Sequence, residues 1–382
     1  MIRRHPSRAI IDLDAYVSNL ELVRRLAGGD AALIPVLKAN AYGHGLVPLA
    51  RAALRVQPNM LAVATVEEGI ALRTAGITAP ILVMVHPHKD AVPFFLEYQL
   101  TLTCSDLNMA QELGARAHAA NCVAPIHCKI DTGMGRQGFN YDEALAALQY
   151  VSRMTHLDLQ GIFTHFPCAD IPDDKFTHDQ IKAFRQLLKQ VDKAGFPYEM
   201  AHAANSAAVV NYQESILDAV RPGLMTYGVW PTAPDKSAAL MKRVLRWETT
   251  VVQIRELPAG ASIGYGRTYK TTKPVKTAVL PVGYADGYKY QLGNKADVLI
   301  RGKRCPVRGS VCMDQIVVDV SEAPDAACGD TATLIGADGD ACITPEELAR
   351  LADTIPYDIL TAIGTRVHRE YTGAGASGDM GA

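Results

Sequence analysis

Short apolar runs alternate with segments of helical periodicity between residues 30 and 230, and this alternation constrains the fold more than any other feature of the chain. An apolar run followed by an amphipathic segment is typical of a β-strand and the helix that crosses back over the sheet. Eight such runs occur, at Ala32–Lys38, Met60–Val66, Ile81–His86, Leu100–Cys104, Pro125–Asp131, Leu159–His165, Met200–Asn205 and Val220–Tyr227. Eight strand and helix units in succession predict a (β/α)8 barrel.

The segments between these runs carry apolar residues at helical spacing, at Val47–Leu54, Val66–Leu72, Asp106–Ala120, Tyr141–Val151 and Thr177–Val191. Ser105 and Thr177 stand where capping residues are expected, because a hydroxyl can accept hydrogen bonds from the free N–H groups of a first helical turn. A further helix is predicted before the first run, over about Asp14 to Leu26.

The pattern changes after Trp230, where Pro231–Asp235 is typical of a linker. Runs rich in Val, Ile and Thr then follow one another between turn signals, at Val244–Leu257, Lys276–Val282, Ala296–Ile300, Gln315–Val320 and Thr331–Ile335. They predict a smaller, mainly β domain, interrupted by a short helix from about Pro345 to Ala352. We place the barrel at residues 1–240 and the second domain at residues 241–382, with a disordered tail from Gly373.

Composition excludes several classes of partner. A formal net charge of −2 and a pI near 6.6 provide neither a basic stripe for nucleic acid nor a polybasic patch for a membrane surface. Met1–Ser7 lacks the apolar region of a signal peptide, and no apolar stretch approaches the roughly 20 residues that span a bilayer. The 8 cysteines form no Cys-x-x-Cys pair, which predicts reduced thiols. We expect a cytoplasmic protein that binds a small molecule and no metal, although His86 and His88 alternate after a strand.

Chemistry-bearing side chains gather where the predicted strands end. In a (β/α)8 barrel the active site lies at the carboxyl ends of the strands, so side chains at those ends meet on one face. The residues concerned are Lys38 after the first run, Lys129, Asp131 and Arg136 at the fifth, His165 after the sixth, Asn205 and Ser206 after the seventh, and Arg221 with Gly223 at the eighth. Together they predict one polar site in the barrel mouth.

Lys38 closes an apolar run and is followed by a small, glycine-rich loop, so its amine can lie in a desolvated pocket suited to covalent carbonyl chemistry. A phosphate suits the loops after the seventh and eighth strands, where Ser206 opens a helical segment and Gly223 allows close backbone approach. Tyr42 offers a phenolic hydroxyl beside this loop. A lysine facing a phosphate pocket indicates pyridoxal 5′-phosphate (PLP), and the alternative guest is a sugar or triose phosphate with Lys38 as an aldolase-type base.

Eight motifs follow one another along nearly the whole chain. They are Val36–Gly45, Lys129–Arg136, His202–Ser206, Arg221–Gly223, Gly264–Thr268, Val282–Gly287, Val311–Gln315 and Ile355–Tyr357. In sequence and in order they resemble the motifs of the PLP-dependent alanine racemases. The resemblance implies a barrel-type, homodimeric isomerase with shared active sites that interconverts L- and D-alanine, and in bacteria it implies a supply of D-alanine for peptidoglycan.

By this resemblance Lys38 binds the cofactor and is one of two bases, and Tyr265 of the other subunit is the second. Two bases suit racemisation, because a proton leaves one face of the α-carbon and another returns to the opposite face. A phenol titrates near 10, so a tyrosinate at neutral pH costs roughly 4 kcal/mol unless nearby cations lower its pKa. His165 and Arg221 are the candidates for that effect.

The resemblance also assigns contacts to the cofactor and substrate. Arg221 is similar to the arginine at the cofactor's ring nitrogen, and Arg136 to the residue at its phenolic oxygen and at the substrate carboxylate. Further cofactor contacts are implied for Tyr42, His165, Asn205, Ser206, Gly223, Leu224 and Tyr357. Met313, through its backbone N–H, and Tyr284 resemble substrate-binding residues, with Tyr284 and Tyr357 narrowing the corridor to the site. Lys129 matches a lysine that is carbamylated in some relatives, and a simple interaction with Asp131 is the alternative.

Two positions depart from the family pattern. Ser310 stands where many relatives have arginine, and Tyr290 stands where a basic residue is often found. Both lie towards the expected entrance, so they leave the preference between alanine and serine open. The alternatives to an alanine racemase are a broad-specificity amino-acid racemase, a barrel decarboxylase and a non-catalytic PLP-homeostasis protein. Residues 244–372 argue against the last, because such barrels resemble only the first domain and lack an equivalent of Tyr265.

Overall fold

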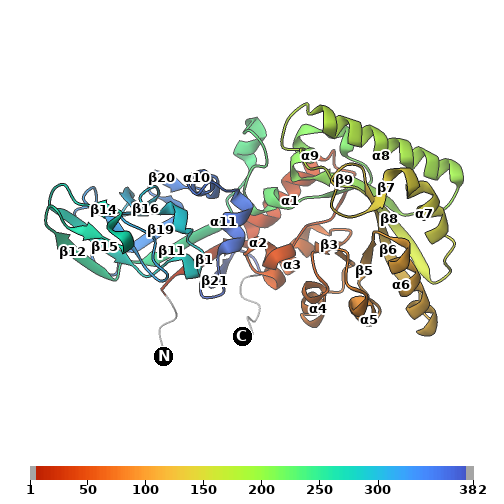
Figure 1. Cartoon of the computed structure of the whole chain (residues 1–382), viewed down its shortest axis with the longest axis horizontal. Helices are drawn as coiled ribbons and strands as arrows, with labels where there is room; N and C mark the ends of the chain where they lie inside the picture. The colour runs from red at the N-terminus through yellow and green to blue at the C-terminus, as the bar shows by residue number, and fades with distance from the viewer. Residues whose placement is uncertain (1–5, 376–382) are drawn as a thin grey trace.

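The structure, a computed structural model, describes residues 6–375 of the chain. Figure 1 shows a barrel with its surrounding helices on the right and a β-rich domain on the left. This arrangement confirms the predicted (β/α)8 barrel followed by a mainly β domain. The predictions for the first residues and for the tail from Gly373 fall in part on residues 1–5 and 376–382, which lie outside the described residues.

Each predicted run of the first domain overlaps one barrel strand. These are β2 (Ala32–Leu33), β3 (Leu61–Val63), β4 (Ile81–Val83), β5 (Thr101–Cys104), β6 (Ala124–Asp131), β8 (Leu157–Phe163), β9 (Met200–Asn205) and β10 (Ala219–Arg221), with β7 (Phe139–Asn140) added to β6. They pair in parallel in the order β2-β10-β9-β8-β6-β5-β4-β3. Beyond β2 the chain pairs with β3 through a parallel bridge between Val36 and Ala62, which closes the barrel.

Helices cover the outside of the barrel, as the periodicity predicts. They are α1 (Leu13–Leu26), α3 (Leu46–Ala53), α4 (Val66–Thr74), α5 (Val92–Glu97), α6 (Leu107–Ala119), α7 (Ala144–Val151), α8 (Lys175–Ala194) and α9 (Ser206–Asn211). The predicted caps Ser105 and Thr177 are wrong. Asp106 caps α6 and Asp174 caps α8, where its carboxylate accepts hydrogen bonds from the backbone N–H and the hydroxyl of Thr177. A carboxylate is a stronger acceptor than a hydroxyl and favours the positive end of the helix dipole.

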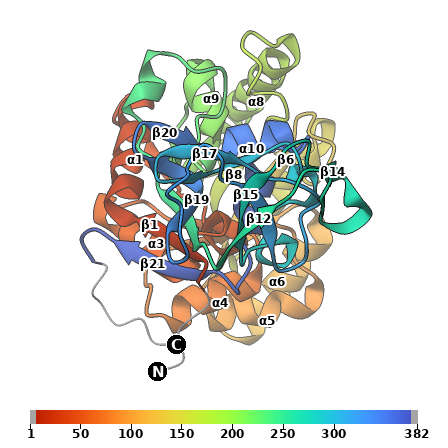
Figure 2. The same cartoon turned by 90° about the vertical axis from the view of Figure 1, so that its left-hand side faces the viewer.

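The second domain is built mainly from antiparallel pairs. Its strands are β11 (Leu245–Thr250), β12 (Gln253–Leu257), β13 (Ser262–Ile263), β14 (Tyr269–Lys270), β15 (Val275–Leu280), β16 (Asp297–Ile300), β17 (Lys303–Pro306), β18 (Ile316–Asp319), β19 (Thr331–Asp338) and β20 (Ala341–Ile343). Helices α10 (Pro345–Leu351) and α11 (Pro356–Ala362) follow. In Figure 2 this domain faces the viewer, with the barrel helices around and behind it.

Strand β1 (Arg8–Asp12) lies in the sheet of the second domain, a placement that the sequence pattern did not predict. It pairs antiparallel with β11 and parallel with β21 (His368–Thr372). From β1 in the second sheet the chain enters the barrel through α1, and it returns to that sheet at β11. The division of the chain at residues 240 and 241 stays a prediction, and β1 precedes that division while belonging to the later sheet.

A membrane span requires a long, apolar helix, and none of the helices within residues 6–375 is long and apolar enough to cross a bilayer.

Candidate active site

A cavity of about 390 Å³ lies at the carboxyl ends of the barrel strands. It brings together most of the residues that the sequence analysis assigned to a site, namely Lys38, Tyr42, Lys129, Arg136, His165, Asn205, Ser206, Arg221, Gly223, Leu224 and Tyr357. Val36, Ala64, Met84, Val85, Gln137 and Phe163 complete the lining and were not predicted. Several of these lie at or just beyond strand ends, so the rule that the site follows the strands could have found them.

The charged side chains of this lining are all cations. Lys38, Lys129, Arg136 and Arg221 all contribute to it, and none of the described residues that line the cavity is an aspartate or a glutamate. Bringing four basic side chains together without an anion is unfavourable, since each positive charge disfavours the others. The cavity is therefore suited to an anionic guest.

Lys38 is delivered into the cavity by a turn of unusual backbone geometry. The four residues that follow it, Ala39 to Tyr42, all have φ between 51° and 53°, which is the left-handed helical region. Left-handed conformations cost L-residues roughly 1–2 kcal/mol each, so surrounding contacts must hold this turn. The strain falls directly beside the predicted reactive amine.

Glu68 and Asn40 fasten the turn. The backbone N–H of Asn40 donates to the Glu68 carboxylate at 3.2 Å, and the same carboxylate accepts from the N–H of Ala64 at 2.9 Å. The side-chain oxygen of Asn40 accepts from the N–H of Leu46 at 2.8 Å, at the start of α3. On the other side, the Arg369 guanidinium donates to the carbonyl of Gly43 at 2.9 Å. Both domains thus hold the Lys38 turn.

The surroundings of the two cavity lysines favour their neutral forms. Burial lowers the pKa of Lys38, and Arg136 and Arg221 lower it further, while Glu68 raises it. The same causes, burial first and then Arg136 and Arg221, lower the pKa of Lys129 to about 7. Both amines therefore become nucleophiles or proton acceptors far more readily than a surface lysine.

Asp131 does not form a hydrogen-bonded ion pair with Lys129 among the residues that the structure describes. Its carboxylate instead accepts from the backbone N–H groups of Gly133 and Gly135, both at 2.9 Å. These bonds hold the pKa of Asp131 below its usual value although burial raises it. Asp131 therefore shapes the loop that leads to Arg136. The Lys129 ammonium instead lies 5.6 Å from the ring centroid of Phe163.

Arg221 is buried, with 4% of its surface exposed, and within residues 6–375 no carboxylate pairs with it. Its guanidinium donates to the carbonyls of Thr164 at 2.7 Å and Ala203 at 3.0 Å, and to Nδ1 of His165 at 3.3 Å. Burial lowers the pKa of Arg221 to about 9. A buried guanidinium whose protein partners are all neutral is poised to donate to a further acceptor in the cavity.

A chain of neutral histidines continues from Arg221. One guanidinium nitrogen lies 2.7 Å from Nδ1 of His202, and Nε2 of His202 lies 2.8 Å from Nδ1 of His127. Because a guanidinium only donates, His202 must carry its proton on Nε2, from which it donates to His127. Burial and Arg221 lower the pKa of His127 to about 3, and the same causes place the pKa of His202 well below its usual value. This chain was not among the predicted site residues.

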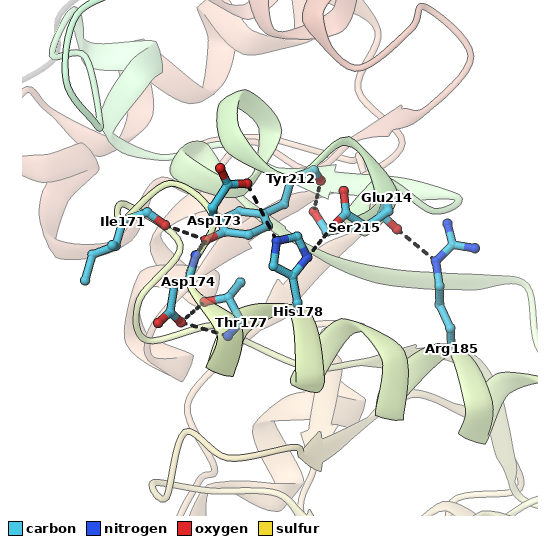
Figure 3. Close-up of polar contacts among 9 residues, drawn as sticks. All are labelled: Ile171, Asp173, Asp174, Thr177, His178, Arg185, Tyr212, Glu214 and Ser215. Atoms are coloured by element: carbon cyan, nitrogen blue, oxygen red, sulfur yellow. Dashed lines mark hydrogen bonds and ion pairs between the residues drawn. The ribbon is translucent and has the colours of Figure 1, made fainter.

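Figure 3 shows the polar contacts that anchor the end of the segment between β8 and α8. The hydroxyl of Tyr212 accepts from the N–H of Asp174 at 2.8 Å and donates to the carbonyl of Ile171. Nδ1 of His178 lies 2.9 Å from the Glu214 carboxylate. The segment between β8 and α8 is therefore tied to the chain that follows α9.

Ser206, Asn205 and Gly223 form the side of the cavity where a phosphate is predicted. Ser206 opens α9 as predicted, and its Oγ accepts from the N–H of Gly223 at 2.9 Å. Asn205 caps the same helix through the N–H of Ala208. A Cβ at Gly223 would lie 2.5 Å from the hydroxyl of Tyr42, so a glycine is required for Tyr42 to reach this point.

Three predicted site residues do not line the cavity of their own chain. Tyr265, Tyr284 and Met313 belong to the second domain and are 76%, 45% and 52% exposed. Strand β14, which follows the turn of Tyr265, lies at the end of the molecule away from the barrel (Figure 1). Tyr357, at the start of α11, is the only predicted site residue of the second domain that lines the cavity among the described residues.

A protein metal site needs several ligating side chains close together. Residues 6–375 hold no group of three or more His, Cys, Asp or Glu side chains that could bind a metal ion. His86 lies 3.2 Å from the carboxylate of Asp106, and His88 lies 3.2 Å from that of Asp90. The two histidines therefore have separate partners.

Comparisons with known proteins cover nearly the whole chain. The family models described as "Alanine racemase, N-terminal domain" and "Alanine racemase, C-terminal domain" match residues 11–231 and 244–371. The alanine racemase of Halothermothrix orenii is 40% identical over 96% of this chain and 97% of its own length, and that of Carboxydothermus hydrogenoformans is 41% identical over 96% and 99%.

Solved structures of alanine racemases are similar to this chain over nearly its whole length. The alanine racemase of Clostridium difficile 630 superposes with a TM-score of 0.91 at 33% identity, covering 97% of this chain and 96% of that one. The alanine racemase from D-cycloserine-producing Streptomyces lavendulae superposes with a TM-score of 0.91 at 35% identity, covering 97% and 98%.

The hydrogen bond between Arg221 and His202 predicts a stability effect. His202→Phe keeps an aromatic ring to stack on Phe163, whose centroid lies 4.8 Å away, but removes the acceptor of a buried guanidinium. We expect the free energy of unfolding to fall by about 1–3 kcal/mol in urea titrations. His156→Phe, at the barrel surface, serves as the control. Equal unfolding midpoints for wild type and His202→Phe would contradict the prediction.

Proposed function

The chain belongs to the alanine racemase family, and from this premise we propose that it uses PLP to interconvert L-alanine and D-alanine. The observation that carries the proposal is the half-buried Lys38 amine, with its lowered pKa, in a cavity whose charged lining residues are all cations. In a bacterium the product D-alanine would serve peptidoglycan synthesis.

The cavity residues fit PLP. The cofactor brings a phosphate and a phenolate, and the lining offers four cations and no carboxylate among the described residues. Arg221, whose protein partners are all neutral, would donate to the ring nitrogen. Arg136 would lie at the phenolic oxygen, and the phosphate would be held by Tyr42, Asn205, Ser206, Gly223, Leu224 and Tyr357. When bound, PLP withdraws electrons from the substrate α-carbon and so acidifies the α-hydrogen.

Lys38 is proposed as the group that binds the cofactor and exchanges a proton with one face of the α-carbon. Its lowered pKa makes the neutral, proton-accepting form of the amine easier to reach than for a surface lysine. The strained turn after Lys38 fixes the start of the side chain, because Glu68 and Asn40 hold the backbone of the turn. Lys38 therefore acts from a defined position in the cavity.

Arg221 is proposed to tune the cofactor. Because it only donates, Arg221 leaves the ring nitrogen unprotonated, and the cofactor is then a weaker electron sink than one facing a carboxylate. His165 and His202 are neutral, since burial and Arg221 place the pKa of each well below its usual value. A weaker sink disfavours side reactions such as transamination.

A second copy of the chain is proposed to complete the site. Tyr265, Tyr284 and Met313 are exposed and do not line their own chain's cavity, which is the arrangement expected of residues that act in a neighbouring subunit. In such a homodimer Tyr265 would exchange a proton at the face opposite Lys38. Arg136 and the backbone N–H of Met313 would bind the substrate carboxylate.

Substrate size would be set by the corridor. Tyr357 lines the cavity, and Tyr284 makes an edge contact with Tyr290 at 6.5 Å between ring centroids. Aromatic rings at the entrance favour a small side chain. Because Tyr290 and Ser310 replace basic residues of many relatives, a broad-specificity racemase is the second candidate. Comparing turnover of alanine, serine and lysine distinguishes the two.

The proposed function is tested by chiral analysis of the product after L-alanine is incubated with purified, PLP-loaded protein. D-alanine should accumulate until both enantiomers are equal. Lys38→Ala should lower the rate by about a thousandfold or more and abolish the absorbance of covalently bound cofactor. Lys193→Ala, at the exposed end of α8, is the matched control. Full racemisation by Lys38→Ala would refute the role of Lys38.

The shared site predicts complementation between inactive variants. Lys38→Ala and Tyr265→Ala should each be inactive alone, and unfolding and refolding them together in equal amounts should restore about a quarter of wild-type activity. Half of the dimers are then mixed, and each mixed dimer has one site with both native residues. A refolded mixture as inactive as its parents would contradict a site shared between subunits.

Lys129 is proposed to carry a carbamate. Its neutral amine attacks carbon dioxide, a nitrogen–carbon bond forms and the amine releases a proton. Since burial and two arginines bring the pKa of Lys129 to about 7, the reactive neutral form is scarce below that pH and dominates above it. With 13C-labelled bicarbonate, a carbamate NMR signal should grow from pH 6 to pH 8 and vanish in Lys129→Ala. A signal that persists in this variant would refute the assignment.

A further inference from the structure

The phenol ring of Tyr265 receives little support from its own chain, since the residue is 76% exposed. Its direction is therefore set by the backbone that carries it. We infer that Ser310, together with Thr268 and Asn294, is a positioning residue that holds the Tyr265 turn for proton transfer. This inference rests on the proposed role of Tyr265 as the second base.

The turn that carries Tyr265 is strained. It forms a short 3-10 segment over Tyr265–Arg267, and Gly264, Gly266 and Arg267 have φ of 72°, 69° and 50°. For a residue with a side chain such as Arg267, the left-handed region costs roughly 1–2 kcal/mol. A segment of this kind keeps one conformation only where neighbouring structure holds it.

A series of hydrogen bonds through three side chains holds the Tyr265 turn in this conformation. The Ser310 hydroxyl donates to the carbonyl of Tyr265 at 3.1 Å, and Oγ of Ser310 lies 3.3 Å from Oγ1 of Thr268. The side-chain amide of Asn294 donates to the same Oγ1 at 3.1 Å.

The hydrogen bonds between these side chains all run in one direction, from Asn294 through Thr268 to Ser310. Because the Ser310 proton is committed to the Tyr265 carbonyl, the Thr268 hydroxyl must donate to Ser310, and Thr268 in turn accepts from Asn294. Each bond therefore depends on the previous one, so the three residues act as a unit.

The hydrogen-bonded series of Ser310, Thr268 and Asn294 is anchored to the backbone at Gly309. The side-chain oxygen of Asn294 accepts from the N–H of Gly309 at 2.7 Å. A Cβ at Gly309 would lie 2.6 Å from the carbonyl of Ile263, so the two segments meet backbone to backbone. Ser310 thus reaches the Tyr265 carbonyl from a segment that is itself locked against the strand before the turn.

The test measures α-hydrogen exchange in D2O separately for the two enantiomers. In the proposed scheme Tyr265 removes the α-hydrogen of L-alanine and Lys38 that of D-alanine. Ser310→Ala should slow exchange from L-alanine by about tenfold relative to exchange from D-alanine, because small displacements of a reacting group are costly. The spectrum of bound cofactor should stay unchanged.

Matched variants make the result specific. Ser310→Thr keeps the hydroxyl and should restore the exchange ratio, while Thr268→Val should act in the same direction as Ser310→Ala and add little to it in the double variant. Ser152→Ala is the control, because Ser152 also donates to a backbone carbonyl, that of Gln149 at 3.0 Å, but lies in the barrel.

Two results would overturn the inference. The first is a Ser310→Ala enzyme with the wild-type exchange ratio, or with both exchanges slowed equally as for a general loss of structure. The second is a Tyr265→Phe enzyme that exchanges L-alanine at the wild-type rate, which would remove the second base itself. The first leaves the proposed function standing and the second does not, so the two failures are distinguishable.

Discussion

The active site depends on one buried cation. Arg221 lies inside the barrel without a carboxylate partner among the described residues, and its protein contacts are carbonyls and neutral imidazoles. Burying a charge is costly unless hydrogen bonds and an opposite charge compensate it. The hydrogen bonds of Arg221 to His202, Thr164 and Ala203 compensate part of that cost. A molecule bound in the cavity would compensate the remaining cost of burying Arg221. This fits a lining in which none of the described residues is an aspartate or a glutamate.

Strain near the reactive groups recurs in both domains. Four left-handed residues follow Lys38, and a second left-handed turn carries Tyr265. In each case hydrogen bonds from elsewhere in the chain hold the backbone, from Glu68 and Arg369 in the first and from Ser310 in the second. The two groups proposed to act on one small substrate are thus fixed through their backbones rather than through the packing of flexible side chains.

Much of this could be predicted from the sequence. The eight apolar runs locate the barrel strands, and the rule that the site follows the strand ends places Lys38, Lys129 and Arg221 in one cavity. Long-range pairing was not predictable. Strand β1 joins the second sheet through partners more than 200 residues away, which periodicity does not reveal. The chain from Arg221 to His127 likewise depends on which strands become neighbours. The departure at Ser310 acquires a meaning only once Tyr265 lies beside it.

The pairing of β1 with β21 has a consequence for biosynthesis. Residues 8–12 are synthesised well before residues 368–372, yet they lie side by side in parallel. The second sheet therefore stays incomplete until β21 has been synthesised, and until then β1 has an unpaired edge. Contacts this distant in sequence slow folding, and an open strand edge invites association with other chains. The pairing of β21 with β1 is thus the step that completes this sheet.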